Sequence, residues 1–123
     1  MHQVARGAAV LLVLLAFTGS AHARDHYGAI AYSPSTGATG YSYDHYTRAD
    51  AEAGALNECG KRASDCQLPL WFRNACGALA VGSGGSWGTG WGTSRGLAER
   101  HALATCRKLT SGCSVASWVC TTR

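Results

Sequence analysis

The stretch Ala51-Glu52-Ala53-Gly54-Ala55-Leu56-Asn57-Glu58-Cys59 returns 47 residues later, from position 51 to position 98, as Ala98-Glu99-Arg100-His101-Ala102-Leu103-Ala104-Thr105-Cys106. Both copies keep an Ala-Glu pair, an Ala-Leu pair and a cysteine at the same spacing. In a helix this spacing gathers alanine, leucine and cysteine into one stripe that faces a sheet. Because the stripe occurs twice, the sequence predicts a duplicated unit.

The matches continue on both sides of this helix. The other aligned segments are Gly28-Ala29-Ile30-Ala31 with Gly77-Ala78-Leu79-Ala80, Thr39-Gly40-Tyr41 with Thr89-Gly90-Trp91, Cys66 with Cys113, and Trp71 with Trp118. Their order is kept, and the differences fall in loops, which favours duplication over chance. Two copies are too few for a solenoid, so we expect one pseudo-twofold domain over 24–123, with repeats at about 27–73 and 76–120.

Each copy is expected to fold as ββαβ. Segments rich in β-branched, aromatic and small apolar residues flank turns at 34–37 and 82–85, which predicts hairpins. Thr47, in a sequence that resembles a capping box, and Ser94 open helices that end near Gly60 and Lys108. The expected strands are 27–33, 38–43 and 67–73, then 77–81, 87–92 and 114–122. The fold class is therefore α+β, with two helices on a largely antiparallel sheet of about six strands.

The first 23 residues have the features of a secretory signal peptide. Arg6 gives a basic start, an apolar run covers 8–17, and Ala21-His22-Ala23 is a small-residue cleavage site. The run is about half of the roughly 20 residues that a membrane-spanning helix needs, so no membrane insertion is expected. We expect the protein in the periplasm or outside the cell.

The charge of the remaining chain is mild. Without Arg6, ten Lys and Arg residues stand against seven Asp and Glu residues, a formal charge of +3. The basic residues are scattered along the chain, whereas a nucleic-acid-binding surface needs them gathered. The sequence therefore predicts no nucleic-acid partner.

The six cysteines of this short chain predict three disulfides. Because Cys59 and Cys66 have the spacing of Cys106 and Cys113, we expect each of these pairs to join a helix end to the following strand. Cys76 and Cys120 are left for each other. The spacing is not the two-to-four-residue clip of a structural zinc site, so no metal or cofactor is expected.

Several strings of residues resemble a known bacterial family. They are Tyr27-Gly28-Ala29-Ile30-Ala31-Tyr32-Ser33, the run from Trp71-Phe72-Arg73-Asn74 through Val81-Gly82, the Trp-Gly pairs at 87 and 91, and Trp118-Val119-Cys120. Together they resemble the exported family known as domain of unknown function 4189 (DUF4189). The resemblance implies small secreted or periplasmic proteins with no agreed enzymatic activity, some of them linked to neutralising toxins from competing bacteria.

Two glutamates occupy matching helical positions. Glu52 and Glu99 fall within the stripe that faces the sheet, and two part-buried carboxylates can act as acid and base in glycoside hydrolysis. Duplication alone produces the same pair. We therefore expect structural roles, in which each glutamate bonds a strand or helix end or pairs with an arginine such as Arg73. No catalytic residue is expected. His101 aligns with Gly54, which indicates an exposed and freely varied position.

The aromatic residues carry the strongest binding signal. They lie on or just beyond the second strand of each hairpin, where alternation exposes part of the set, and such side chains are typical of interfaces. Residues that break the repeat are further candidates, because inheritance does not explain them. The candidate binding residues are Tyr41, Tyr43, His45, Tyr46, Arg73, Asn74, Trp87 and Trp91.

These features predict a non-enzymatic exported binding protein. The leading hypothesis is an inhibitor or immunity protein that occludes the active site of a toxin from a competing bacterium. The alternative is a module that binds the cell wall or another glycan, with Trp87, Trp91 and neighbouring tyrosines stacked on sugars. A small secreted hydrolase that uses Glu52 or Glu99 is the third hypothesis.

Overall fold

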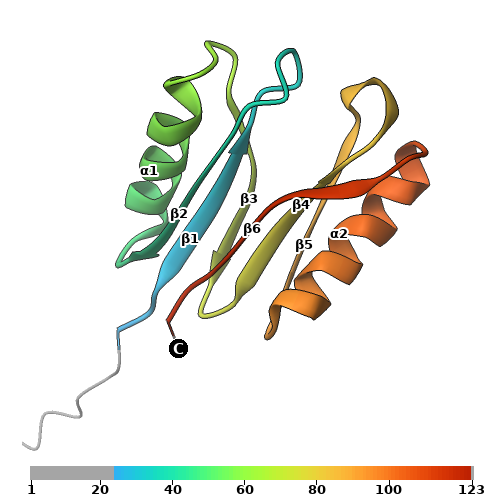
Figure 1. Ribbon diagram of the computed structural model, residues 1–123. Helices are drawn as coiled ribbons and strands as arrows, with labels where there is room; N and C mark the ends of the chain where they lie inside the picture. The colour runs from blue at the N-terminus through green and yellow to red at the C-terminus, as the bar shows by residue number, and fades with distance from the viewer. Residues whose placement is uncertain (1–23, 123) are drawn as a thin grey trace, which may run out of the picture.

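The computed structural model describes residues 24–122, and the predicted signal peptide lies outside this range. Both expected ββαβ units are present (Figure 1). The first comprises β1 (Tyr27–Tyr32), β2 (Thr39–His45), α1 (Arg48–Gly60) and β3 (Gln67–Arg73). The second comprises β4 (Cys76–Val81), β5 (Trp87–Gly92), α2 (Arg95–Leu109) and β6 (Ser114–Cys120), with a short 3₁₀ turn (Ser83–Gly85) between β4 and β5.

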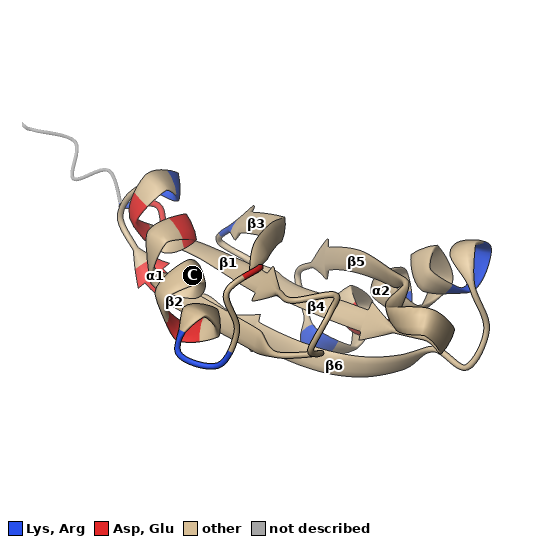
Figure 2. Ribbon diagram, turned by 90° about the horizontal axis from the view of Figure 1, so that it is seen from above, with Lys and Arg blue, Asp and Glu red and all other residues tan. Residues whose placement is uncertain are grey.

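The six strands are divided equally between two antiparallel sheets. The strand orders are β2-β1-β3 and β5-β4-β6, so each copy forms one sheet with its first strand in the centre. The sheets lie between the helices, and the layers run α1, first sheet, second sheet, α2 (Figures 1 and 2). The α+β class and the ββαβ repeat are confirmed. The separation into two sheets follows from the central strands, which are apolar on both faces and need a cover on each.

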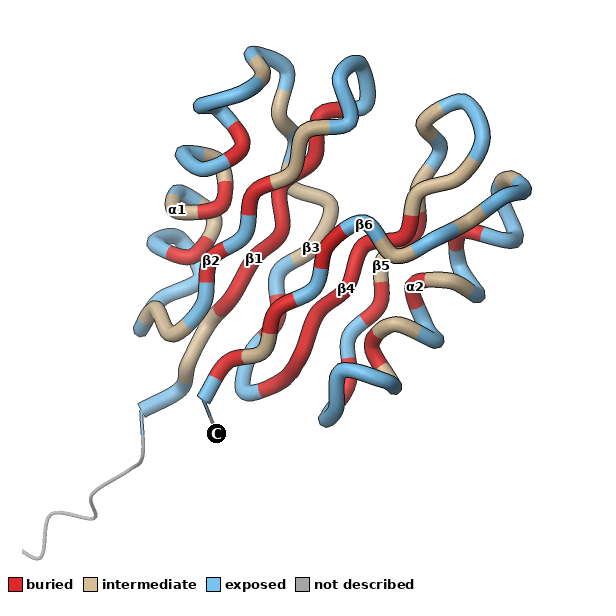
Figure 3. Tube along the Cα trace, in the orientation of Figure 1, coloured by how far each residue is buried: buried red, intermediate tan, exposed pale blue. Residues whose placement is uncertain are grey.

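Alternation along the central strands supplies the apolar layers. In β1, Ile30 faces the second sheet and Ala29 faces α1, and in β4 Leu79 and Ala78 are arranged in the same way. Figure 3 shows both strands as buried along most of their length. The core between the sheets is formed by Ile30, Tyr32, Phe72, Ala75, Leu79 and Val119.

Each helix packs unusually close to the second strand of its hairpin. A Cβ atom added to Gly40 of β2 would lie 2.3 Å from the backbone nitrogen of Cys59, and one added to Gly88 of β5 would lie 2.3 Å from that of Cys106. The facing helical residues are buried alanines and cysteines at every fourth position. Small residues on both elements therefore set the distance between helix and sheet.

Three disulfides join the pairs expected from the repeat: Cys59–Cys66, Cys106–Cys113 and Cys76–Cys120. The first two tie the end of each helix to the segment before the last strand of its copy. The third joins the central strand of the second sheet to β6. The long-range bridge therefore lies within one copy, and the two copies are held together by packing and hydrogen bonds.

Several expected boundaries differ by one or two residues. β1 ends at Tyr32, one residue early, because the carbonyl of Ser33 accepts the Gly37 N–H at 2.8 Å and starts the turn. β2 continues to His45 and is longer than expected. Both helices begin one residue after their caps: the Thr47 hydroxyl accepts the Asp50 N–H at 3.1 Å, and the Ser94 hydroxyl accepts the Leu97 N–H at 3.2 Å.

Candidate functional site

A groove runs along the seam where the edges of the two sheets meet at β2 and β6. Its volume is about 920 Å³. We call it the β2–β6 groove. Its lining residues are Thr39, Gly40, Tyr41, Tyr43, Glu58, Arg62, Ala116, Ser117, Trp118, Val119 and Cys120.

Three exposed aromatic side chains give this groove its character. Tyr41 and Tyr43 point to the same side of β2 because side chains alternate along a strand, and their ring centroids lie 6.4 Å apart. Their exposures are 48% and 55%, and Trp118 on β6 is 40% exposed. The prediction that alternation exposes the tyrosines of this strand agrees with their positions. Trp118 was not among the predicted binding residues.

A second groove lies between β3 and β5. These two strands lie side by side on the other side of the sheets from β2 and β6 (Figure 2). Its volume is about 490 Å³. Trp71 of β3 and Trp91 of β5 line it, together with Pro69, Leu70, Phe72 and Arg73. We call it the β3–β5 groove. The repeat aligns Tyr41 with Trp91 and Trp118 with Trp71, so the two grooves are related by the pseudo-twofold symmetry.

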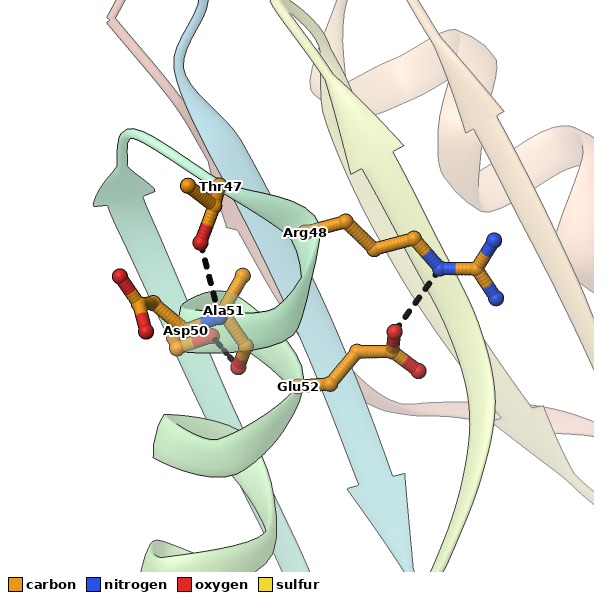
Figure 4. Close-up of polar contacts among 6 residues, drawn as sticks. Thr47, Arg48, Asp50, Ala51 and Glu52 are labelled. Atoms are coloured by element: carbon orange, nitrogen blue, oxygen red, sulfur yellow. Dashed lines mark hydrogen bonds and ion pairs between the residues drawn. The ribbon is translucent and has the colours of Figure 1, made fainter.

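A stacked arginine sits beside each groove. The guanidinium of Arg48 lies 4.5 Å from the ring centroid of Trp71, and its Nε bonds Glu52 at 2.8 Å (Figure 4). In the second copy the Arg95 guanidinium lies 3.8 Å from the ring centroid of Trp118. Arg95 also forms an ion pair with Glu99. Each glutamate therefore pairs with an arginine one helical turn away, and that arginine lies over the ring of a tryptophan.

The two glutamates do not share a site. Glu52 lies on α1 and Glu99 on α2, the outer layers at opposite ends of the stack (Figure 1). Acid–base pairs in glycoside hydrolases have carboxyl groups at most about 9.5 Å apart. The glutamate pairs with an arginine, as one of the structural readings expected, but the partner comes from its own helix. Arg73 pairs instead with Asp25, with 3.7 Å between Nη1 and Oδ2.

Arg73 and Asn74 hold the segment that precedes β1. The Asn74 side chain accepts the His26 N–H and donates to Asp25, both at 2.9 Å. Its φ of +48° is a left-handed conformation in which asparagine is enriched. Tyr46 contributes to the same anchor, because the Arg24 guanidinium lies 4.6 Å from its ring centroid. These three candidate residues therefore have a structural explanation within the chain.

His45 on β2 and His101 on α2 lie in equivalent regions of the two copies, although they belong to different elements. The ring of His45 lies against Gly54, where an added Cβ atom would lie 3.1 Å from Nε2. In the second copy His101 stands at the position of Gly54, and its Nδ1 donates to the carbonyl of Trp91 at 2.9 Å. His101 is exposed, as expected, and it also satisfies a carbonyl at the edge of the sheet.

Trp87 is the aromatic candidate whose side chain is partly covered by the rest of the fold. It is half-buried and packs against the core between the sheets. The face of β5 that points away from α2 points at the other sheet, so a side chain in the strand is covered. Trp91 stands at the end of the same face and is 60% exposed.

Two aspartates accept hydrogen bonds from hydroxyl groups. Hydrogen bonds from the Thr122 side chain and backbone, both 2.7 Å long, hold the pKa of Asp44 below its usual value, and the nearby His26 and His45 act in the same direction. Hydrogen bonds from Ser33 and Ser35 similarly lower the pKa of Asp65. Asp44 thereby joins the end of β2 to the segment after β6.

Trp71 and Trp118 are functional candidates that the sequence analysis missed. The two residues match each other in the repeat, and a repeated aromatic residue is as easily explained by packing in a core as by binding. A usable signal was present in the matched pairs Arg48-Glu52 and Arg95-Glu99, which place an arginine at the start of each helix. Within residues 24–122, no cluster of three or more His, Cys, Asp or Glu side chains is placed to hold a metal ion.

A family model described as "Domain of unknown function (DUF4189)" matches residues 27–120. The chain belongs to the DUF4189 family. The match covers every strand and helix described above, from the first residue of β1 to the last of β6.

Mycobacterial proteins are among the relatives of this DUF4189 chain. Protein Rv1269c of Mycobacterium tuberculosis is 43% identical over 100 residues, which cover 81% of this chain and 73% of the relative. Protein Mb1300c of Mycobacterium bovis has the same identity and coverage. The NMR structure of Rv1813c from Mycobacterium tuberculosis is also similar, with 37% identity, a TM-score of 0.55, and coverage of 77% of this chain and 74% of that one. None of the helices in the described part of our chain is long and apolar enough to cross a membrane.

Proposed function

We propose that this domain is a non-enzymatic exported binding protein that holds a partner protein in the β2–β6 groove. The most specific form of the proposal is an inhibitor or immunity protein that neutralises a toxin from a competing bacterium by covering its active site. The observation that carries the binding role is the gathering of Tyr41, Tyr43 and Trp118 in one groove.

The composition of the groove supports a protein partner. Tyrosine, tryptophan and arginine dominate the residues that contribute most to protein–protein affinity. The β2–β6 groove contains all three, with Arg62 and Glu58 on its border. Tyrosine and tryptophan lose little conformational entropy when they are held, so they bind well without remodelling.

The scaffold behind the groove supports the same role. Three disulfides and two closely packed helices hold the strands. A preorganised surface loses less entropy on binding, which favours a tight complex. An inhibitor that must block an active site needs this rigidity more than it needs any reactive group.

The test is whether a gene next to this one encodes a secreted toxin and whether this protein binds that toxin. We expect a one-to-one complex by calorimetry and loss of the toxin's activity at equal concentration. Tyr43→Ala should weaken binding by about 30-fold, the effect of about 2 kcal/mol that defines a strongly contributing residue. Tyr46→Ala is the matched control, because Tyr46 is similarly exposed, at 57% against 55%, but does not line the groove. Equal effects of the two variants would contradict the proposal.

A glycan ligand is the second candidate, and the β3–β5 groove is the observation that favours it. Trp71 and Trp91 line this groove and are both exposed, as rings that stack on sugars must be. Trp87, which was part of the original hypothesis, is too covered to serve. If this function is correct, the protein should sediment with purified peptidoglycan and Trp91→Ala should abolish the effect. Tyr43→Ala, in the opposite groove, should sediment like the wild type.

A further inference from the structure

We propose that the outer edge of β6 accepts an extended segment of the partner protein as an added β-strand, which lies in the β2–β6 groove. The inference rests on the proposed function, because it describes how that partner is held. It concerns the backbone of β6, whereas the proposal above concerns the side chains of the groove.

The groove runs along a strand edge. β6 is a terminal strand of its sheet and pairs only with β4. Five consecutive residues of β6, 116–120, line the groove. Successive side chains point to opposite faces of a sheet, so a surface that touches all five must follow the edge and its backbone.

The register shows which backbone groups point into the groove. In an antiparallel pair, residues alternate between those that bond the neighbouring strand and those that point away from it. The Thr121 N–H donates to the Ala75 carbonyl at 2.9 Å, so Thr121 is directed at the β4 side. Cys120 and Trp118 alternate along β6 with the residues that bond β4. Their N–H and C=O groups therefore point into the groove.

The end of the same edge already binds an acceptor. Thr122 points away from β4, as Cys120 does. Its N–H donates to Oδ1 of Asp44 at 2.7 Å. The Asp44 carboxylate stands where the carbonyl of a neighbouring strand would stand. The next outward groups, at Cys120 and Trp118, have no such partner among residues 24–122.

Each of the other three edges has at least one backbone position that cannot pair with an added strand. On β2, the Arg62 side chain donates to the Thr39 carbonyl. On β5, His101 donates to the Trp91 carbonyl. β3 contains Pro69, which has no N–H to offer an added strand. Proline is a device by which proteins protect sheet edges, and each of the two hydrogen bonds occupies one carbonyl near an end of its strand. Residues 116–120 of β6 have neither.

Pro69 and Ala116 show the contrast between the β3 and β6 edges at equivalent positions of the two copies. The offset of 47 that aligns Trp71 with Trp118 also aligns Pro69 with Ala116. Both residues fall where the register of their strand shifts by one residue against the central strand. The first copy thus has a proline in the bulge of its outer strand, and the second copy has an exposed alanine.

The groove also indicates the chemistry of the segment. Tyr41 and Tyr43 flank one side of an added strand and favour apolar or aromatic side chains at alternate positions. Glu58 pairs with Lys61 at 3.0 Å, whereas Arg62 has no ion pair within the described residues. Arg62 is therefore a cation at the border of the groove that no carboxylate among the described residues neutralises, which favours an acidic residue where the segment passes it.

A displayed library of random ten-residue peptides tests this inference without a known partner. We expect selection against the purified protein to yield peptides with alternating apolar residues and an acidic residue. In hydrogen exchange followed by NMR, a bound peptide should slow the amides of Trp118 and Cys120 at least about tenfold. Binding that leaves both amides unchanged would overturn strand addition.

A proline substitution provides the matched variant. Ala116→Pro copies the residue that the first copy already tolerates, so thermal unfolding should stay close to that of the wild type. We expect it to weaken the peptide at least about tenfold by removing a donor and obstructing the edge. Pro69→Ala should leave the peptide affinity unchanged. If Ala116→Pro does not fold, the exchange measurement on the wild type decides.

The remaining outcomes separate this inference from the proposed function. A toxin that binds Ala116→Pro normally but fails to bind Tyr43→Ala would leave the function standing and overturn strand addition. Sedimentation that shows a dimer with protected Trp118 and Cys120 amides and no peptide would assign the edge to a second copy. Selected peptides that bind wild type and Ala116→Pro equally would also overturn the inference.

Discussion

The two copies share the contact between helix and sheet but differ where strands end. Cys76 and Cys120 face each other across β4 and β6, and the matching register pair in the first copy is Tyr27 and Arg73. One copy has a covalent bridge at this position. The other has Tyr27 stacked on Trp71, with 6.3 Å between ring centroids, and an ion pair from Arg73 to Asp25.

This difference teaches which parts of the repeat form the scaffold. The alanine stripe, the close glycine and the short disulfide recur because each is needed to seat a helix on its sheet. The outer strands have no such constraint, so they differ in bridge, bulge residue and aromatic side chains. Function in a duplicated domain is therefore best sought at the edges.

The largest expected effect separates the long disulfide from the short ones. Replacing Cys76 and Cys120 together with alanine should lower the free energy of unfolding by about 4 kcal/mol, because the bridge closes a loop of 44 residues. Replacing Cys59 and Cys66 should cost about 2.5 kcal/mol, since that loop spans 7 residues. Chemical denaturation measures both. Equal losses of unfolding free energy would mean that loop entropy does not determine how much each disulfide stabilises the protein.

The next effect tests whether the two copies are equivalent at the close contact. Gly40→Ala and Gly88→Ala should each cost about 3 kcal/mol, because the new methyl group would meet helix backbone that cannot move aside. Thermal unfolding gives the comparison. Gly96→Ala on α2 is the control and should stabilise by about 0.5 to 1 kcal/mol, since the atom nearest to the new methyl group would be Nη1 of Arg100 at 3.6 Å, an ordinary van der Waals distance. A large difference between Gly40→Ala and Gly88→Ala would break the equivalence.

Asp44 tests the link between the copies and gives it a pH dependence. Asp44→Asn should cost about 1 kcal/mol at neutral pH, the net value of a typical hydrogen bond. Because the pKa of Asp44 is lowered from 3.8, its contribution is complete above about pH 5 and is lost as the pH falls through the lowered value. Unfolding measured from pH 7 to pH 2 should bring the two proteins together at the acid end. A constant difference at all pH values would contradict this assignment.

The smallest expected effect concerns the stacked arginines. Arg48→Met and Arg95→Met should each cost about 0.5 to 1 kcal/mol, through loss of the cation–π contact with Trp71 or Trp118. Tryptophan fluorescence during unfolding reports both the stability and the exposed ring. Similar losses in the two variants would support the symmetry of the grooves, and a loss confined to one would break it.

Much of the fold was predictable from the sequence because its periodicities are strong. Alanines at every fourth position fix the faces of both helices, and the repeat fixes their order with the strands. The repeat also relates Cys59 and Cys66 to Cys106 and Cys113, which leaves one pairing for the other two cysteines. These inferences use spacing within a copy, which is local.

The parts that were missed depend on how one copy faces the other. A repeat shows that two units are equivalent but does not say which surfaces they present to each other, so the two facing sheets were not foreseen. For the same reason Trp87 was expected to be open, although the other sheet covers it. Arg73 was a candidate partner for a glutamate, although a residue 48 positions earlier, Asp25, pairs with it.

Pro69 also determines how far this molecule can grow by pairing. The β3 and β6 edges lie at opposite seams (Figure 2). If both accepted strands, one molecule could join a neighbour on each side, and repetition of that contact would build a fibre. A proline in one of the two edges stops the series after a single addition. If a strand is added at β6 as proposed, the single proline at position 69 would thus keep the duplicated fold from open-ended polymerisation.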